Sequence, residues 1–186
     1  NREVERLKAK TGELSAEKEK ELANVKNTYE NLVKEMQSEI EKGDIKITQA
    51  VDRLTVNLVE KILFDSGEAD VKPEGLKILK RVGDILKNIS DKQIRVEGHT
   101  DNVKISARLR NKFPTNWELS TARASNVVRY LQDKVGITPR SLSAAGMSEF
   151  RPVASNETEQ GRAQNRRIEI ALLPLDIESV LQELKK

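Results

Sequence analysis

Two charged side chains in the middle of the sequence have the residue types and the spacing of a ligand site. The stretch 94–99 alternates apolar and polar residues, as a β-strand does, and runs into a turn that carries Asp101. Residues 116–131 have the pattern of a helix in which Arg123 lies along the apolar stripe. A buried guanidinium is costly unless an anion meets it. We therefore expect either an internal salt bridge or an anion-binding site beside Asp101.

A carboxylate and a guanidinium that face one cleft suit a ligand with both an ammonium group and a carboxylate, as the end of an α-amino acid has. Arginine presents a planar fork of donors to a carboxylate, and the N-terminus of the helix adds free N–H groups and a positive dipole. Lysine would not replace Arg123 in this role. The competing interpretation, an Asp101–Arg123 salt bridge, predicts no ligand.

Composition disfavours catalysis, metal binding and nucleic-acid recognition. The chain has one histidine, His99, and no cysteine, so it lacks the residues for a zinc site and shows no nucleophile elbow for a Ser-His-Asp triad. Its 33 Lys and Arg residues are interleaved with 30 Asp and Glu residues, and aromatic residues are few and scattered. We expect no catalytic residue, no metal, no cofactor and no nucleic-acid partner, and a structural role for His99.

The elements around these residues begin with a long helix. Residues 1–43 are dense in Glu and Lys, and Gly43 ends a helix of about 60 Å at 1.5 Å per residue. Its apolar seam repeats with the period of a straight helix rather than a strict heptad. A narrow seam needs a partner, most simply the same helix of a second chain, although i,i+4 pairs also allow such a helix to stay single. The seam residues are Val4, Leu7, Thr11, Leu14, Leu22, Val25, Tyr29, Leu32, Met36 and Ile40.

The pattern of residues 44–174 predicts one α+β domain. Alternating apolar positions predict strand over 45–64, and Pro73 opens a helix that leads to the central strand. Two more strands are predicted at 141–145 and 166–173, with a polar loop between them.

The helix between the central strand and these last strands has clear boundaries. It begins at the capping box Thr115–Glu118 and ends near Gly136. The order β-α-β-α-β-β makes a sandwich of two helices on one face of a mixed sheet. A short amphipathic helix is expected at 175–186.

Three blocks of the sequence resemble the signature blocks of the OmpA-like peptidoglycan-binding domain. They are Val96-Glu-Gly-His-Thr-Asp101, Asn116-Trp-Glu-Leu-Ser-Thr-Ala-Arg-Ala124 and Gly161-Arg-Ala-Gln-Asn-Arg-Arg-Ile-Glu-Ile170. The blocks occur in the family's order, cover about residues 52–173 and imply the same fold. The long loop at 103–113 resembles the MotB-like subgroup of this family.

The resemblance also implies a ligand. In the family, the residues that match Asp101 and Arg123 hold the diaminopimelate of the peptidoglycan stem peptide. Further positions that match the family's site are Thr100, Asn116, Leu119, Ser120, Asn165 and Arg166. We expect Asn165 and Arg166 to support the cleft, and a ligand contact by Arg166 is left open.

This resemblance implies a noncovalent cell-wall anchor in the periplasm, and the apolar seam of the long helix predicts that it pairs as a homodimer. No apolar run approaches the roughly 18–20 residues that span a bilayer, so we expect attachment to the inner or outer membrane through a segment upstream of this chain. Two alternatives stay open. One is a flagellar-stator component whose wall binding is regulated, and the other is a structural assembly protein with no ligand.

Overall fold

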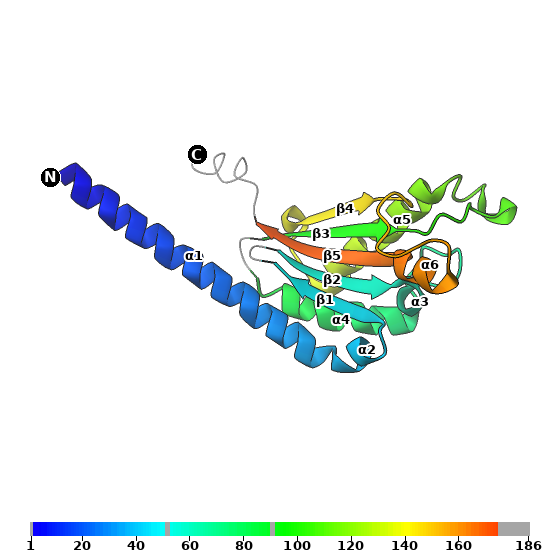
Figure 1. Cartoon of the computed structure of the whole chain (residues 1–186), viewed down its shortest axis with the longest axis horizontal. Coiled ribbons are helices and arrows are strands. Elements are labelled where there is room, and N and C mark those ends of the chain that lie inside the picture. The colour runs from blue at the N-terminus through cyan, green and yellow to red at the C-terminus, as the bar shows by residue number, and fades with distance from the viewer. Residues whose placement is uncertain (1, 51–52, 90–91, 175–186) are drawn as a thin grey trace.

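The centre of the molecule is a five-stranded sheet in the order β1-β2-β5-β3-β4 (Figure 1). The computed structural model describes residues 2–50, 53–89 and 92–174. The strands are β1 (Ile45–Gln49), β2 (Leu54–Val59), β3 (Lys92–His99), β4 (Leu142–Gly146) and β5 (Arg167–Pro174). β3 and β4 run parallel and the other neighbouring pairs are antiparallel. The predicted α+β class with a mixed sheet is confirmed.

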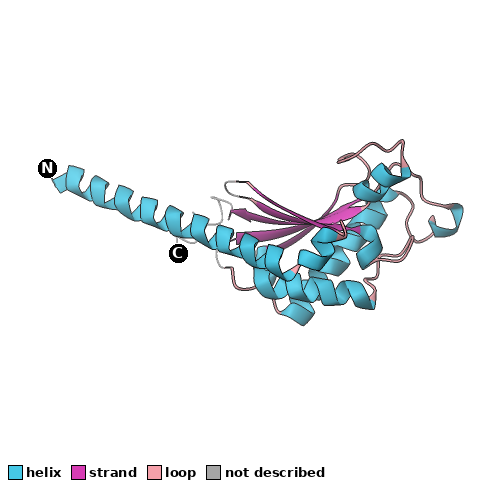
Figure 2. Ribbon diagram, turned by 60° about the horizontal axis from the view of Figure 1, so that its bottom comes forward, coloured by secondary structure: helices cyan, strands magenta, loops and turns pink. Residues whose placement is uncertain are grey.

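Helices cover one face of this sheet, as Figure 2 shows. Those that pack on it through the core are the C-terminal part of α1 (Arg2–Glu35), α4 (Pro73–Leu86) and α5 (Asn116–Tyr130). The other helices of the described residues are α2 (Gln37–Glu41), α3 (Glu60–Leu63) and α6 (Glu159–Asn165), with short turns η1 (Ala107–Leu109), η2 (Leu131–Val135) and η3 (Pro139–Ser141). Leu79 of α4 and Val127 of α5 pack with Val56 and Ile170 of the sheet in one core. Because side chains alternate along a strand, residues such as Asn57 and Glu169 lie on the opposite, polar face.

α5 approaches the ends of β3 and β4 closely because two glycines leave room for it. A Cβ atom at Gly98 would lie 2.1 Å from the carbonyl oxygen of Ser120. A Cβ atom at Gly146 would lie 2.1 Å from the hydroxyl oxygen of Thr121. The two glycines are paired across β3 and β4, so the same turn of α5 rests on both strands.

Both ends of the helical segment that contains α5 are where the sequence predicts them. The Thr115 hydroxyl accepts a hydrogen bond from the Trp117 N–H at 3.1 Å, and the Glu118 carboxylate accepts one from the Thr115 N–H at 2.7 Å. The helical path continues through the π-helical turn η2 and ends at Gly136, which has a φ of +82°. Glycine adopts this conformation without steric cost because it has no Cβ atom. The helix that carries Arg123 is therefore fixed at each end by local interactions.

The long N-terminal helix has an exposed part and a docked part. It projects away from the sheet in Figure 1 and breaks at Met36, where α1 gives way to α2. Val25, Leu32 and Met36 are buried in the core of the sheet domain, and Lys92 of β3 pairs with Glu21. The C-terminal half of the predicted seam is thus covered by the chain itself. The apolar residues of α1 that stay exposed, by 39% to 59%, are Val4, Leu7, Leu14 and Leu22.

The strand that was expected to continue to Phe64 ends at Val59, and residues 60–63 form the one-turn helix α3 instead. The Glu60 N–H donates to the carbonyl oxygen of Arg166 at 2.8 Å, and the chain turns away from the sheet there. Leu63 and Phe64 are buried all the same. Their apolar character therefore reflects packing in the core, and an isolated β-bridge between Phe64 and Val71 lies outside the sheet.

Two other predictions concern the C-terminal part of the chain. The polar loop expected before the last strand contains α6, which Thr158 caps by accepting a hydrogen bond from the Gly161 N–H at 3.1 Å. The amphipathic helix expected at 175–186 lies outside the described residues. Within the described ranges, no helix combines the length and the apolar character needed to cross a membrane.

Candidate functional site

Four side chains of alternating charge are linked beside the carboxyl end of β3. Asp101 Oδ2 accepts a hydrogen bond from Arg166 Nη1 at 2.6 Å. Arg166 Nε lies 3.0 Å from Glu60 Oε2, and Glu60 Oε1 accepts from Arg123 Nη2 at 2.5 Å. Asp101 and Arg123 are only 6% and 3% exposed, so each of these buried charges depends on its partner. We call Asp101, Arg166, Glu60 and Arg123 the charge network.

Arg123 is held in place by partners from the stretch 60–68. Its Nε donates to the carbonyl oxygen of Glu68 at 2.8 Å, and its guanidinium carbon lies 4.9 Å from the centre of the Phe64 ring. Burial lowers the pKa of Arg123, and the carboxylates of Glu60 and Asp101 act in the opposite direction. An arginine keeps its charge at neutral pH despite such a shift. The result is a fixed cation with a defined donor geometry.

Arg166 is the most exposed member of the charge network, with 29% of its side chain accessible to solvent. Its Nη2 donates to Glu159 Oε1 at 2.9 Å, so this side chain touches three carboxylates. Burial acts to lower the pKa of Arg166, but hydrogen bonds to Asp101 and Glu159 outweigh it and raise that pKa.

The turn that carries Asp101 is fixed by its neighbours. Asp101 Oδ1 accepts a hydrogen bond from the Val103 N–H at 2.9 Å, and Thr100 Oγ1 donates to the Asp101 carbonyl oxygen at 2.9 Å. Asn116 Nδ2 donates to the carbonyl oxygens of Asp101 and Val103 at 3.3 and 3.0 Å, and to Glu149 Oε2 at 2.8 Å. The first residue of α5 therefore ties three separate segments together.

The remaining predicted site residues are buried and already have partners. Ser120 Oγ accepts from the Ser148 N–H at 3.1 Å. The Asn165 amide accepts from the N–H groups of Val153 and Ala154 at 2.8 and 2.9 Å, which secures the segment before α6. Leu119 packs in a small cluster with Ala69, Ile105 and Phe113 that supports the long loop. We interpret these residues as supports of the site.

The structure brings Asp101, Arg123 and Arg166 together, yet it does not pair Asp101 with Arg123 directly. Glu60 and Arg166 lie between them in the charge network. Glu60 was missing from the predicted site, because it lies 63 residues before Arg123 in a stretch interpreted as strand. A carboxylate inside an otherwise apolar stretch was the one signal that could have identified it.

A second polar cluster lies on the other face of the sheet. Potential metal-ligating atoms of Glu97, His99 and Glu169 lie within 4.8 Å of one another, and the buried His99 Nε2 is 3.6 Å from Glu97 Oε2. Arg167 donates twice to Glu169 Oε1, at 2.8 and 2.6 Å, and Arg151 lies 3.9 Å from Glu97. The His99 side chain lowers the pKa of Glu97 against the effect of burial. Because arginines balance both carboxylates, we interpret this cluster as an internal ion network.

The fold defines an α+β domain of the MotB-like type, with a mixed sheet, helices on one face and a long N-terminal helix. The chain belongs to the OmpA family, which it matches over residues 63–166. Motility protein B of Bacillus subtilis is 35% identical over 156 residues, or 84% of this chain and 58% of that protein. Peptidoglycan-binding protein ArfA of Mycobacterium tuberculosis is 35% identical over 111 residues, or 60% of this chain and 32% of that protein.

Solved structures agree with this assignment. A putative MotB-like protein from Desulfovibrio vulgaris superimposes with a TM-score of 0.75 at 29% identity, covering 84% of this chain and 98% of that chain. The cell wall anchor of the T6SS from Pseudomonas aeruginosa gives a TM-score of 0.69 at 36% identity, covering 77% and 96%. The chain spans less than two thirds of the length of both curated relatives.

Proposed function

We propose that this chain is a noncovalent peptidoglycan-binding module that holds the diaminopimelate of a stem peptide in the charge network. The alternation of two carboxylates and two guanidiniums carries this proposal. A zwitterionic amino-acid end fits that pattern, with its ammonium group against Asp101 and its carboxylate against Arg123. The similarity to a peptidoglycan-binding mycobacterial protein and to a cell wall anchor supports the same ligand class. The module binds and does not catalyse.

Binding exchanges contacts within the charge network. In the ligand-free chain the Arg166 side chain donates a hydrogen bond to Asp101, and the Arg123 side chain donates one to Glu60. The ammonium group of the ligand takes the place of Arg166, and its carboxylate takes the place of Glu60. The displaced Arg166 and Glu60 are already 3.0 Å apart and keep pairing with each other. No charge is left buried without a partner, so the exchange avoids the largest cost of opening a buried ion pair.

The cell-wall contact serves as one end of a tether. We place the domain in the periplasm, joined to a membrane through a segment upstream of this chain and paired with a second copy through α1. Charge-assisted hydrogen bonds contribute roughly 1.5–3 kcal/mol each, and ordering of the peptide offsets part of this, so one site binds with about micromolar to millimolar affinity. The overall affinity is much higher when a dimeric, membrane-bound protein faces a polymer with many copies of the ligand, because the effective concentration of ligand is high.

A second candidate is a flagellar-stator component whose wall binding is regulated. The similarity to a motility protein over 84% of this chain favours it. An upstream membrane-spanning helix with an aspartate in the full-length protein would support this candidate, whereas a lipid-modified cysteine would support a general wall anchor.

Two conservative variants of the charge network test the proposal. Asp101→Asn removes the negative charge, and Arg123→Lys removes the planar fork of donors. We expect each variant to bind a diaminopimelate-containing muropeptide about tenfold more weakly or worse, and to be lost from a pull-down with purified sacculi. The matched controls Asp133→Asn and Arg129→Lys change exposed residues of the same helical segment and should bind like the parent.

Three outcomes would each contradict a different part of the proposal. If both Asp101→Asn and Arg123→Lys bind like the parent, with unchanged circular dichroism, the charge network is not the ligand site. Absence of any saturable muropeptide signal in the parent would favour the structural assembly protein. A lysine-type stem peptide lacks the second carboxylate and should bind about tenfold more weakly, so equal affinity would contradict the choice of diaminopimelate.

A further inference from the structure

Exposed apolar side chains are concentrated around the candidate site. Apart from α1, the large hydrophobic residues that the described part of the chain exposes are Val103, Trp117, Phe150 and Val153, at 48% to 65%. The Val103 N–H donates to Asp101 and the Val153 N–H donates to Asn165. Trp117 and Phe150 directly follow Asn116 and Glu149, which are hydrogen-bonded to each other. Exposed apolar groups that cluster in this way commonly mark a binding surface.

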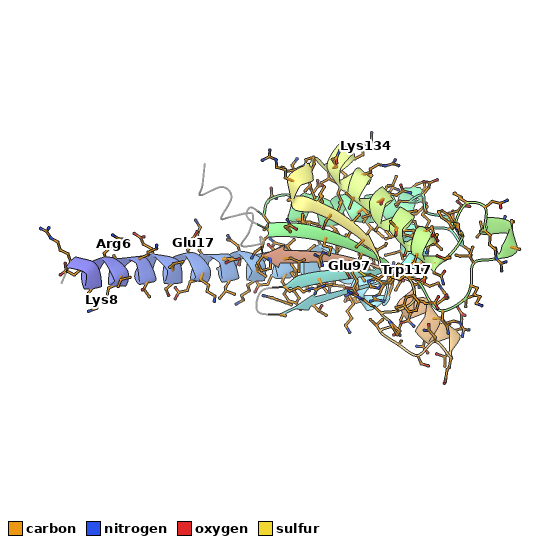
Figure 3. All side chains as sticks on the ribbon, turned by 90° about the horizontal axis from the view of Figure 1, so that it is seen from above. Arg6, Lys8, Glu17, Glu97, Trp117 and Lys134 are labelled. Atoms are coloured by element: carbon orange, nitrogen blue, oxygen red, sulfur yellow. The ribbon has the colours of Figure 1, made fainter. Side chains whose placement is uncertain are left out.

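The centre of this apolar rim is a pair of aromatic rings. The ring centroids of Trp117 and Phe150 lie 5.5 Å apart with an interplanar angle of 31°. Trp117 belongs to the first turn of α5, and Figure 3 shows it at the end of the sheet where Glu97 of β3 also lies. Two segments far apart in the sequence therefore present one aromatic surface to solvent.

The backbone on both sides of this pair is fixed before any ligand arrives. The Trp117 N–H donates to the Thr115 hydroxyl within the capping box. On the other side, Ser148 has a φ of +53°, a conformation that residues other than glycine rarely adopt, and its N–H donates to Ser120. A ligand that stacks here gains contact area with little loss of backbone entropy.

We propose that Trp117 and Phe150 form a stacking platform for a pyranose ring of the glycan strand whose stem peptide occupies the charge network. This inference rests on the proposed function, and it adds a sugar subsite to that site. One face of a pyranose ring presents polarised C–H bonds, which the negative face of an aromatic ring attracts. Its hydroxyl groups project from the edge, and the polar residues Asn116, Glu118 and Glu149 directly flank Trp117 and Phe150 in the sequence.

The size and position of the platform favour a sugar over a protein partner. A stable protein interface buries about 800 Å² on each side, far more than two side chains cover. The glycan is covalently linked to the stem peptide, so a peptide held at Asp101 brings a sugar to the rim beside it. The platform therefore predicts that the site binds the junction between the glycan strand and its stem peptide.

A pair of titrations of the full chain tests this inference. One ligand is the diaminopimelate-containing stem peptide without sugar, and the other is the same peptide on its N-acetylglucosamine–N-acetylmuramic acid disaccharide. We expect the disaccharide to improve the affinity of the parent roughly three- to tenfold. Trp117→Ala and Phe150→Ala should each lose most of that gain and keep the affinity for the sugar-free peptide. Val153→Ala, which shortens an exposed apolar residue outside the aromatic pair, is the control.

The intrinsic fluorescence of the chain gives an independent readout, because Trp117 is its single tryptophan. The disaccharide-bearing peptide should shift the emission to shorter wavelength, and the sugar-free peptide should not. A parent that binds both ligands equally, or a Trp117→Ala variant that weakens both equally, would overturn the sugar subsite and leave the proposed function intact. A concentration-dependent dimer of the chain that Trp117→Ala abolishes would overturn it in favour of a contact between copies. Failure of the proposed function would give a different result, because Asp101→Asn would then bind both ligands with the affinity of the parent.

Discussion

Glu60 balances the charges of two guanidinium groups at once, those of Arg123 and Arg166. Its two carboxylate oxygens contact Arg123 and Arg166, and 13% of its side chain is exposed. Removal of one partner from a buried ion pair costs more than the pair contributes, because the remaining charge stays buried without compensation. Glu60 therefore decides whether Arg123 can be kept inside the domain in the absence of ligand.

Glu60→Gln should destabilise the chain by about 2 kcal/mol, because the amide keeps the shape of the side chain but not its charge. Urea denaturation followed by circular dichroism measures this change. The control Glu74→Gln removes the same charge from an exposed position in the first turn of α4 and should stay within about 0.5 kcal/mol of the parent. Equal stability of the two variants would show that Arg123 does not need Glu60.

At the scale of elements, the position of α5 relative to the sheet decides where Arg123 lies. Capping residues set where this helix begins and ends, but the close approach at Gly98 sets its distance from β3. Arg123 follows Ser120 by three residues, so a shift of the helix at Ser120 moves the guanidinium with it.

Gly98→Ala should therefore lower both stability and ligand affinity. Its Cβ atom would lie 2.1 Å from the Ser120 carbonyl oxygen, which forces α5 away from β3 at a cost of about 2 kcal/mol. Thermal denaturation measures the first effect and muropeptide titration the second. Gly12→Ala provides the contrast, because nothing lies within 4 Å of the added Cβ atom and alanine favours the helix. A Gly98→Ala variant that matches the parent in both measurements would contradict this account of α5 placement.

At the scale of the whole molecule, α1 divides its apolar residues between two uses. Val25, Leu32 and Met36 pack against the domain, and this docking fixes the direction in which the helix leaves it (Figure 1). The exposed stripe that includes Leu7 and Leu14 has no partner within the described chain. We infer that a second copy of α1 covers it, because a narrow apolar seam on a long helix gains stability chiefly from another helix.

The double variant Leu7→Lys and Leu14→Lys should weaken self-association about tenfold or more without changing the thermal unfolding of the sheet domain. Sedimentation equilibrium over a range of concentrations measures the association. The control Ala9→Lys and Ala16→Lys adds the same charge at the same spacing on the opposite side of the helix. A parent that stays monomeric, or a control that dissociates equally, would contradict pairing through this stripe.

The sequence by itself determined the elements whose signals are local. The capping box at Thr115, the stop at Gly136 and the alternation in β3 all depend on partners within a few residues, and the structure confirms them. It also indicated that Arg123 lies on the buried face of α5. The C-terminal end of the strand predicted over 45–64 was wrong, because residues 60–63 form the one-turn helix α3 and the adjacent residues Leu63 and Phe64 are both buried in the core.

The tertiary structure alone decided which charges meet. Arg123 contacts Glu68 and Glu60, which precede it by 55 and 63 positions. Asp101 pairs with Arg166, which follows it by 65 positions. Such pairings follow from the strand order and from the contact of α5 with β3, neither of which a local pattern encodes. The same holds for the Trp117–Phe150 pair, because adjacency in space across 33 residues arises only once the sheet has assembled.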